Sequence, residues 1–534
     1  MGKYWNGRFR LAAGGVLLAA AVIVPSVATA SDVEPRRPGP IGRIPDALLP
    51  EELRQLAPPS EPKKEEADPA EAQRGPEILS QRTESGRTFA TDQPGVYATE
   101  SSTAPMHARD PNTGSWVEID PQLQANERGG FDAPLTSAPV SIGSNAASSP
   151  LARVEAPSGG SVGFSLDGAA PAPAKRVSET SVVYEDAIGA VDVELTATAS
   201  GVKETLILDS AADATTYRFK LDVDGGLQPT LEADGAIAFR AKGKEEPALR
   251  IPHGWMEDSG IDPAIGRAAF SDAVSYSLQQ EQGQWVLEVG LDREWLRAPE
   301  RVFPVRVDPT LTGTVPGLDD TMVSSYFPTT DLSSALWSYV GAGGLWDIER
   351  SFTHLPVYDG ALAGMTIHGA SLNVWQFTGH RCDAGRDLFR VTDPWTGSTT
   401  NFSNQPAVGD LLAQSTASFA GPGSGCETPA TISYDITQAA RNWADGTWDN
   451  NGVSLWASNP GFTSPSQQGV FGTADNGIYT PYTLTMWSDP GATGIPEAPS
   501  KPDAQRSGGY RRTGSVGDVS GLRRRPWVCD LSCV

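Results

Sequence analysis

The chain has 534 residues, enough for two or three domains, and a formal net charge of −24 from 65 acidic and 41 basic side chains. Binding to nucleic acid relies on a basic face that neutralises phosphates, so this charge balance predicts no nucleic-acid partner. With only four cysteines and five histidines in the chain, a metal centre built from these residue types is not indicated either.

Residues 1–30 have the three parts of a secretory signal peptide. Three basic residues come first, the apolar run Leu11–Val24 follows, and the small residues Ala28-Thr29-Ala30 form a cleavage site. A run of about 14 apolar residues is shorter than the roughly 20 that a membrane-spanning helix needs. We therefore expect a secreted or extracellular protein, with no membrane span in the mature chain and with association to the cell wall as a further option.

Both ends of the mature chain have compositions that disfavour a folded core. Residues 31–81 are rich in Pro, Glu and Lys, and residues 491–534 carry a basic cluster, Arg523-Arg524-Arg525. Neither segment holds enough large apolar side chains to offset the entropy lost on folding. We predict a disordered linker at 31–81 and a disordered tail at 491–534.

The sequence of residues 82–312 has the pattern typical of antiparallel β-structure. Val191–Ala197 and Tyr217–Val223 alternate apolar and polar residues with a period of two, which is typical of strands with one buried face. Asp224-Gly225-Gly226 stands between two such runs, where a hairpin turn requires residues that tolerate positive φ. No helical pattern intervenes, so the default architecture is a sandwich.

A second β-rich region spans 318–490. Ala370–Trp375 and Tyr482–Trp487 alternate as strands do, whereas Ile436, Ala439, Ala440 and Trp443 follow helical spacing. The fold class predicted for the whole chain is all-β. It comprises two antiparallel β-sandwich or jelly-roll-like units, a disordered N-terminal spacer, and one helix in the second unit.

Cysteine, aspartate and aromatic residues supply the candidate sites. Cys382 and Cys426 lie in the second unit at a spacing unlike that of a zinc site, and in an exported protein they predict a disulfide. Asp319 and Asp320 open the second unit as weak candidate ligands of a structural calcium ion. No specific catalytic nucleophile, base or metal motif stands out, so no catalytic residue is assigned.

Tryptophan is concentrated in the second region. Trp337, Tyr339 and Trp346 fall in a Gly-rich stretch, where an aromatic side chain has less reason to pack than on a strand. Flat aromatic rings stack on sugar rings, so these three residues are candidates for carbohydrate binding. The competing interpretation is a core filled by aromatic side chains.

Residues 82–310 resemble the amino-terminal region of secreted RHS/YD-repeat, wall-associated proteins of Gram-positive bacteria. The resemblance rests on segments in the same order, the most specific being Trp116–Asp120, Tyr184–Asp192 and Phe303–Thr310. It implies a β-rich surface region that long YD-repeat arrays, and in some proteins a toxin domain, would follow. Neither a repeat array nor such a domain is recognisable in this chain.

Residues 319–489 resemble a DNRLRE domain, a jelly roll similar to carbohydrate-binding modules. The matching segments are Asp319–Val323, Ile367–Val374 and Thr399–Pro406. The motif that names the domain is poorly preserved, the nearest segment being Glu349-Arg350-Ser351-Phe352. This resemblance implies carbohydrate recognition by the second unit.

These features together predict a secreted, non-enzymatic cell-wall or extracellular surface module, similar to the N-terminal part of an RHS/YD-repeat protein. The first alternative is a polysaccharide-binding accessory protein, and the second is a secreted polysaccharide hydrolase or lyase. The expected partner is a cell-wall or extracellular polysaccharide and not nucleic acid. No cofactor is expected beyond the candidate calcium ion, and the sequence does not indicate an oligomeric state.

Overall fold

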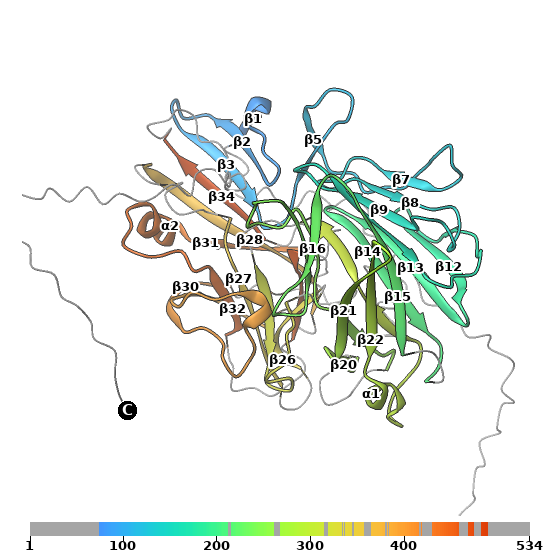
Figure 1. Ribbon diagram of the computed structural model, residues 1–534. Coiled ribbons are helices and arrows are strands. Elements are labelled where there is room, and N and C mark those ends of the chain that lie inside the picture. The colour runs from blue at the N-terminus through green and yellow to red at the C-terminus, as the bar shows by residue number, and fades with distance from the viewer. Residues whose placement is uncertain are drawn as a thin grey trace, which may run out of the picture. The chain divides into compact units, whose positions relative to one another are not determined.

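The computed structural model describes residues 74–489 with several internal gaps (Figure 1). The gaps are residues 212–214, 261–267, 314–318, 334, 336, 344–346, 357–361, 363–364, 380–381, 383, 416–417, 419–429, 459–467 and 475–481. The predicted signal peptide and the predicted tail therefore lie outside the described residues, as does most of the predicted linker.

The first β-sandwich is formed by two antiparallel sheets. One sheet has the order β21-β22-β15-β10-β9-β8-β7-β6. Its strands are β6 (Gln124–Ala125), β7 (Phe131–Ala133), β8 (Val140–Ile142), β9 (Ala152–Glu155), β10 (Ser161–Leu166), β15 (Thr216–Val223), β21 (Val274–Glu281) and β22 (Gln284–Leu291). In β15 the side chains of Tyr217, Phe219 and Leu221 are buried, because alternate residues of a strand face the same side.

The facing sheet follows the order β11-β12-β13-β14-β24-β18-β17-β16, and β19, β20 and β23 pair beside it. Its strands are β11 (Lys175–Arg176), β12 (Ser181–Ile188), β13 (Val191–Thr198), β14 (Gly201–Leu208), β16 (Leu227–Leu231), β17 (Ile237–Ala241), β18 (Leu249–Ile251), β19 (Trp255–Glu257), β20 (Phe270–Ser271), β23 (Val305–Asp308) and β24 (Thr310–Gly313). Every residue of β14 is buried. The two sheets share one hydrophobic core that includes Tyr184, Leu206 and Phe219.

The second β-sandwich is built from strands that form one continuous, wrapped sheet with the order β1-β2-β3-β34-β28-β33-β26-β27-β32-β29-β30. The strands are β1 (Arg74–Glu77), β2 (Gly86–Thr91), β3 (Tyr97–Ser102), β25 (Asp320–Ser324), β26 (Trp337–Gly343), β27 (Asp347–Thr353), β28 (Ile367–Gly379), β29 (Arg386–Val391), β30 (Val408–Ser415), β31 (Ala430–Asp435), β32 (Val453–Ala457), β33 (Gly469–Gly472) and β34 (Tyr482–Ser488). Strand β26 joins the two halves, because it pairs with β33 through Trp337–Val340 and with β27 through Gly341–Gly343. The core between the halves includes Leu372, Leu455 and Phe471.

The helices are short. They comprise α1 (Arg293–Arg297), α2 (Thr437–Ala444) and the 3-10 turns η2 (Leu79–Gln81) and η3 (Gly397–Thr399), and a small ribbon pairs β4 (His107–Arg109) with β5 (Trp116–Glu118). Helix α2 is the predicted helix, and its apolar face, including Ala440 and Trp443, is buried as expected. None of the helices in the described ranges is long and apolar enough to cross a membrane. The predicted all-β class with two antiparallel sandwiches is confirmed.

Chain segments that lie far apart in sequence meet at one edge of the second sandwich. Strand β3 pairs with β34 from Tyr97–Ser488 to Ser102–Thr483, so the blue N-terminal strands lie beside the orange-red strand in Figure 1. The sheet thus crosses the domain boundary predicted between residues 312 and 318. The predicted linker also extended to residue 81, whereas 74–81 contains β1 and η2.

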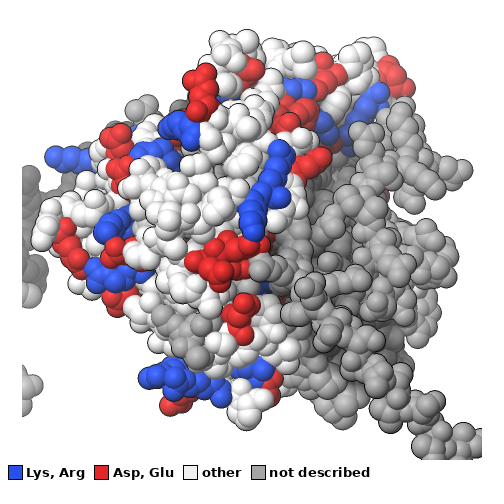
Figure 2. Space-filling model, turned by 90° about the vertical axis from the view of Figure 1, so that its right-hand side faces the viewer, with Lys and Arg blue, Asp and Glu red and all other residues white. Residues whose placement is uncertain are grey.

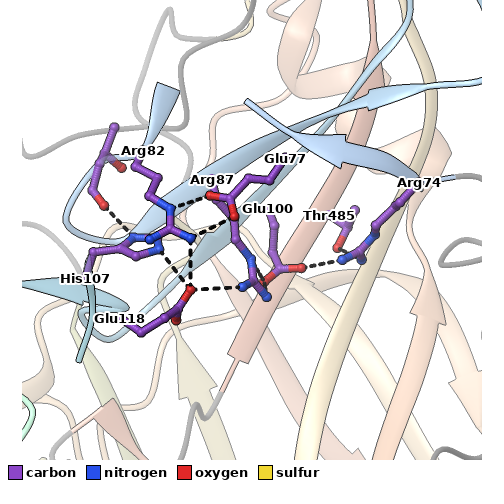
Figure 3. A network of polar contacts seen from close by, with 9 residues as sticks. Arg74, Glu77, Arg82, Arg87, Glu100, His107, Glu118 and Thr485 are labelled. Atoms are coloured by element: carbon purple, nitrogen blue, oxygen red, sulfur yellow. Dashed lines mark hydrogen bonds and ion pairs between the residues drawn. The ribbon is translucent and has the colours of Figure 1, made fainter. Parts of the chain in front are cut away.

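A polar network fixes these N-terminal strands in place (Figure 3). The Glu100 carboxylate on β3 accepts hydrogen bonds from Arg74 at 2.6 Å and from Arg87 at 2.7 Å. Arg74 also donates to the Thr485 hydroxyl of β34 at 3.0 Å. Because Glu100 is almost fully buried, each guanidinium offsets part of the desolvation of its charge. The network therefore ties β1 and β2 to the last strand of the second sandwich.

One carboxyl group in the first sandwich is buried without compensation. The Glu204 side chain on β14 is fully buried, and its Oε1 atom has no hydrogen-bond partner. Burial raises the pKa of this carboxyl well above its ordinary value. Its proton is therefore held more tightly in the folded chain than in the unfolded chain, and stability falls as the pH rises above the ordinary carboxyl range.

The substitution Glu204→Gln should consequently stabilise the protein at pH 8, by about 1–3 kcal/mol. The amide keeps the shape of the carboxyl group but never has to lose a proton. Thermal unfolding of both proteins between pH 4 and pH 8 measures the effect, and the gain should shrink toward pH 4. An equal difference in melting temperature at every pH would contradict this account.

Candidate functional site

The predicted aromatic binding platform is not assembled. Trp337 on β26 is buried, with 7% of its surface exposed, and its ring centre lies 4.7 Å from that of Phe377 and 6.4 Å from that of Trp375. Tyr339 packs against a small core that contains Trp255 and Met322. Trp346 lies outside the described residues. The expectation of an exposed platform is therefore wrong for Trp337, because neighbouring aromatic side chains cover it, whereas Tyr339 is partly buried.

The two candidate calcium ligands are engaged in backbone hydrogen bonds. The Oδ2 atom of Asp319 accepts a hydrogen bond from the Gly397 amide at 2.9 Å, and the Oδ2 atom of Asp320 accepts one from the Ala474 amide at 2.8 Å. Across the ranges that the structure describes, no cluster of three or more His, Cys, Asp or Glu side chains is arranged to hold a metal ion. These carboxylates act as anchors for neighbouring loops.

Cys382 is disulfide-bonded. Its partner lies outside the described residues, as does Cys426. The pairing of Cys382 with Cys426 therefore stays a prediction, which mass spectrometry of unreduced peptides would check.

One cavity, which we call the junction pocket, has a volume of about 370 Å³ and is lined by residues of both sandwiches. Its charged or titratable lining residues are Glu232, Asp234, Arg240, Glu246, Arg250, His253, Asp319, Asp320 and Asp331. Arg240 pairs with Glu232 at 2.6 Å, and Arg250 is ion-paired with Asp234. Since carboxylates outnumber cations and both arginines are engaged, the pocket would repel a free phosphate group.

Asp331 is a carboxyl group of the junction pocket whose pKa is raised. Burial raises the pKa of its carboxyl, against the opposing effect of a hydrogen bond from the Ser333 amide at 2.9 Å. Nearby His253 packs its ring against Tyr276, with 6.2 Å between ring centres. The sequence reasoning missed this juxtaposition, because the two residues come from different sandwiches.

A second constellation lies on the outer face of the second sandwich. We call it the arginine–tryptophan strip, and it consists of Arg350, Phe389, Leu411 and Trp456. The Arg350 guanidinium lies 3.7 Å from the centre of the Trp456 ring, which in turn lies 4.9 Å from the Phe389 ring. Leu411 is 45% exposed beside them on β30. Sequence reasoning quoted Arg350 only as part of a degenerate motif and gave it no role.

The charge distribution elsewhere is mixed. On the face of the molecule shown in Figure 2, basic and acidic side chains are interspersed and no broad basic area is seen. Within the first sandwich, Arg153 forms an ion pair with Asp222 and Lys175 forms one with Glu185. Whether an individual basic side chain is paired with a carboxylate therefore describes the local surface charge better than the total charge of the chain does.

No protein-family model matches the chain. It is, however, similar to curated bacterial nucleases that act on tRNA. These relatives are the tRNA nuclease WapA of Bacillus subtilis (strain 168), 25% identical over 406 residues, and the tRNA3(Ser)-specific nuclease WapA of Bacillus spizizenii, 26% identical over 397 residues. The tRNA(Glu)-specific nuclease WapA of Bacillus subtilis subsp. natto matches equally at 25%.

The matches cover 71% of this chain for the Bacillus subtilis proteins and 69% for the Bacillus spizizenii protein. The chain spans only 16% of the length of each relative. The similarity therefore concerns one portion of much longer proteins.

These relatives overturn the functional expectations drawn from the sequence. A non-enzymatic wall module was expected, with a polysaccharide as partner and without nucleic acid, whereas the relatives are named as enzymes that cleave tRNA. The assignments to the cell wall and to carbohydrate binding are not supported. The error has a physical origin, because a net charge summed over the whole chain does not describe the charge at any one surface.

Proposed function

We propose that this chain takes part in tRNA cleavage, as a β-rich portion of a nuclease similar to WapA. The similarity over 71% of the chain carries this proposal. The matched stretch is longer than either β-sandwich alone, so the similarity includes residues of both sandwiches. The known activity belongs to proteins of which this chain spans 16%, and the role of the portion within them is what we propose.

Export is a further part of the proposal. The basic, apolar and small-residue parts of residues 1–30 support a secretory signal. The resemblance to secreted RHS/YD-repeat proteins and to a DNRLRE domain supports the same route. A nuclease that leaves its producing cell would meet its tRNA substrate elsewhere, and a disulfide at Cys382 is compatible with an oxidising exterior.

Binding of tRNA by the full chain tests the proposal. Labelled tRNA should be retained by the purified protein more strongly than double-stranded DNA of equal charge, and retention should fall only modestly with salt. A shallow salt dependence is expected because an acidic protein forms few phosphate contacts. The absence of tRNA retention at any salt concentration would refute the proposal for this portion.

A further inference from the structure

A groove lies beside helix α2 in the second sandwich, and residues of α2 and of strand β30 line it (Figure 1). Its volume is about 510 Å³, which is within the range of pockets that hold small ligands. We call it the exit groove. Its large apolar lining residues are Leu411, Leu412, Ile436 and Trp448, and its basic lining residues are His368 and Arg441.

The apolar part of the exit groove is only partly covered by the sandwich itself. The Leu411 side chain is 45% exposed, and Leu412 and Trp448 are partly buried at the margin of the core. Strand β30 stands at the end of the strand order, where it pairs with β29. Proteins commonly cover the edge of a sheet with another segment, because an exposed apolar edge invites association. The groove therefore has the character of a surface that receives a further segment.

The described part of the chain ends beside this groove. Strand β34 finishes at Ser488, and the amide of Asp489 donates a hydrogen bond to the Thr366 carbonyl at 3.2 Å. The carboxylate of Asp489 is hydrogen-bonded to Nε2 of His368 at 2.8 Å. Since His368 lines the exit groove, residues 490–534 start from a point that is fixed next to it.

The groove also presents a positive charge. The guanidinium of Arg441 donates hydrogen bonds to the carbonyl oxygens of Ile367 at 2.9 Å and of His368 at 3.2 Å. Within the ranges that the structure describes, no carboxylate lies within ion-pair distance of Arg441. The nearby carboxylate of Asp435 accepts hydrogen bonds from the amide and the hydroxyl of Thr437. Arg441 can therefore accept an acidic partner from a segment that enters the groove.

We propose that residues 490–497 of this chain bind in the exit groove, with the Ile495 side chain against its apolar residues and the Glu497 carboxylate on Arg441. The segment thereby covers the edge at β30 and sets the direction in which the chain leaves the second sandwich. This inference goes beyond the proposed function and does not depend on it.

The sequence of the segment fits the groove in order and in spacing. Ile495 is the first large apolar residue after Asp489, and Glu497 is the first acidic one. Alternate residues of an extended segment face the same side, so both side chains can point into the groove. Pro496 restricts Ile495 to extended conformations, which reduces the entropy lost on binding. Six extended residues span about 20 Å, so Ile495 can lie against the groove while Asp489 stays on His368.

Hydrogen–deuterium exchange of the full chain, measured at the amides of residues 408–415, tests the proposal. Ile495→Asp should speed this exchange about tenfold, the factor that corresponds to partial burial of one aliphatic side chain. Glu497→Arg should speed it as well, and adding Arg441→Glu should restore slow exchange because the ion pair re-forms with its signs exchanged. The matched controls Val516→Asp and Asp503→Arg, placed further along the chain, should exchange as wild type does.

The substitutions at Ile495 and Glu497 remove none of the contacts among the described residues, so the sandwich should stay folded in both variants. Exchange at residues 408–415 that is equal in wild type and Ile495→Asp would overturn the proposal. Protection that persists in both variants and rises with protein concentration would assign the groove to a second copy of the chain, and would overturn it too. No tRNA is present in the measurement, so its result is separate from that of the tRNA-binding test.

Discussion

Replacing Trp337 by Ala should lower the free energy of unfolding by about 3–5 kcal/mol, the cost of deleting a large buried aromatic side chain. Trp337 is 7% exposed and contacts the rings of Trp375 and Phe377. Removal of its indole would leave a cavity that the rigid strands β26 and β28 cannot close. Chemical denaturation followed by fluorescence or circular dichroism measures the loss.

A suitable control is Trp448→Ala, because Trp448 is only partly buried at the margin of the core of the second sandwich. This second variant should lose clearly less stability than Trp337→Ala. If the Trp337 variant unfolded at the wild-type denaturant concentration, Trp337 would have to be exposed in solution. Such a result would restore the interpretation of this residue as a surface platform.

The second large effect concerns a buried ion pair in the first sandwich. Lys203 of β14 and Asp308 of β23 form an ion pair in which both side chains are about 95% buried, since their exposed fractions are 4% and 5%. The Thr310 hydroxyl donates to the same aspartate at 2.6 Å. The substitution Asp308→Ala should cost about 3–5 kcal/mol, because it removes the carboxylate that is ion-paired with a buried lysine charge.

The double substitution of Lys203 by Met and Asp308 by Leu separates charge from packing. Replacing both partners by apolar residues of similar volume should recover most of the stability lost in the single variant. Equilibrium unfolding of the wild type, the two single variants and the double variant gives the coupling energy between the positions. A double variant as unstable as the sum of the two single variants would show that the charges do not interact.

The fold class could be predicted because strand periodicity is a local property of the sequence. The alternation in Tyr217–Val223 appears as β15, and the helical spacing around Ala440 appears as α2. Helix α1 was missed because its five residues are too few to show a period, although Asp292 caps it through hydrogen bonds to the amides of Glu294 and Trp295. The pairing of β3 with β34 could not be predicted, since it joins segments almost 400 residues apart and leaves no local signal.

The candidate sites were harder to predict for the same reason. Gly-rich surroundings suggested that Trp337 is exposed, but β28 brings Trp375 and Phe377 against it. The arginine–tryptophan strip depends on register between β27, β32 and β29, which no single segment encodes. The total charge of the chain argued against nucleic acid, whereas the local environment of Arg350 contains no paired carboxylate.

The most direct test of a role in tRNA cleavage uses the relative whose activity is known. Cleavage of tRNA would be compared for WapA of Bacillus subtilis (strain 168), for a variant that lacks the segment matching this chain, and for a chimera in which residues 74–489 of this chain replace it. Our account predicts that deletion lowers tRNA cleavage and that the replacement restores it. Cleavage that is unaffected by the deletion, or that a correctly folded chimera fails to restore, would contradict the proposed function.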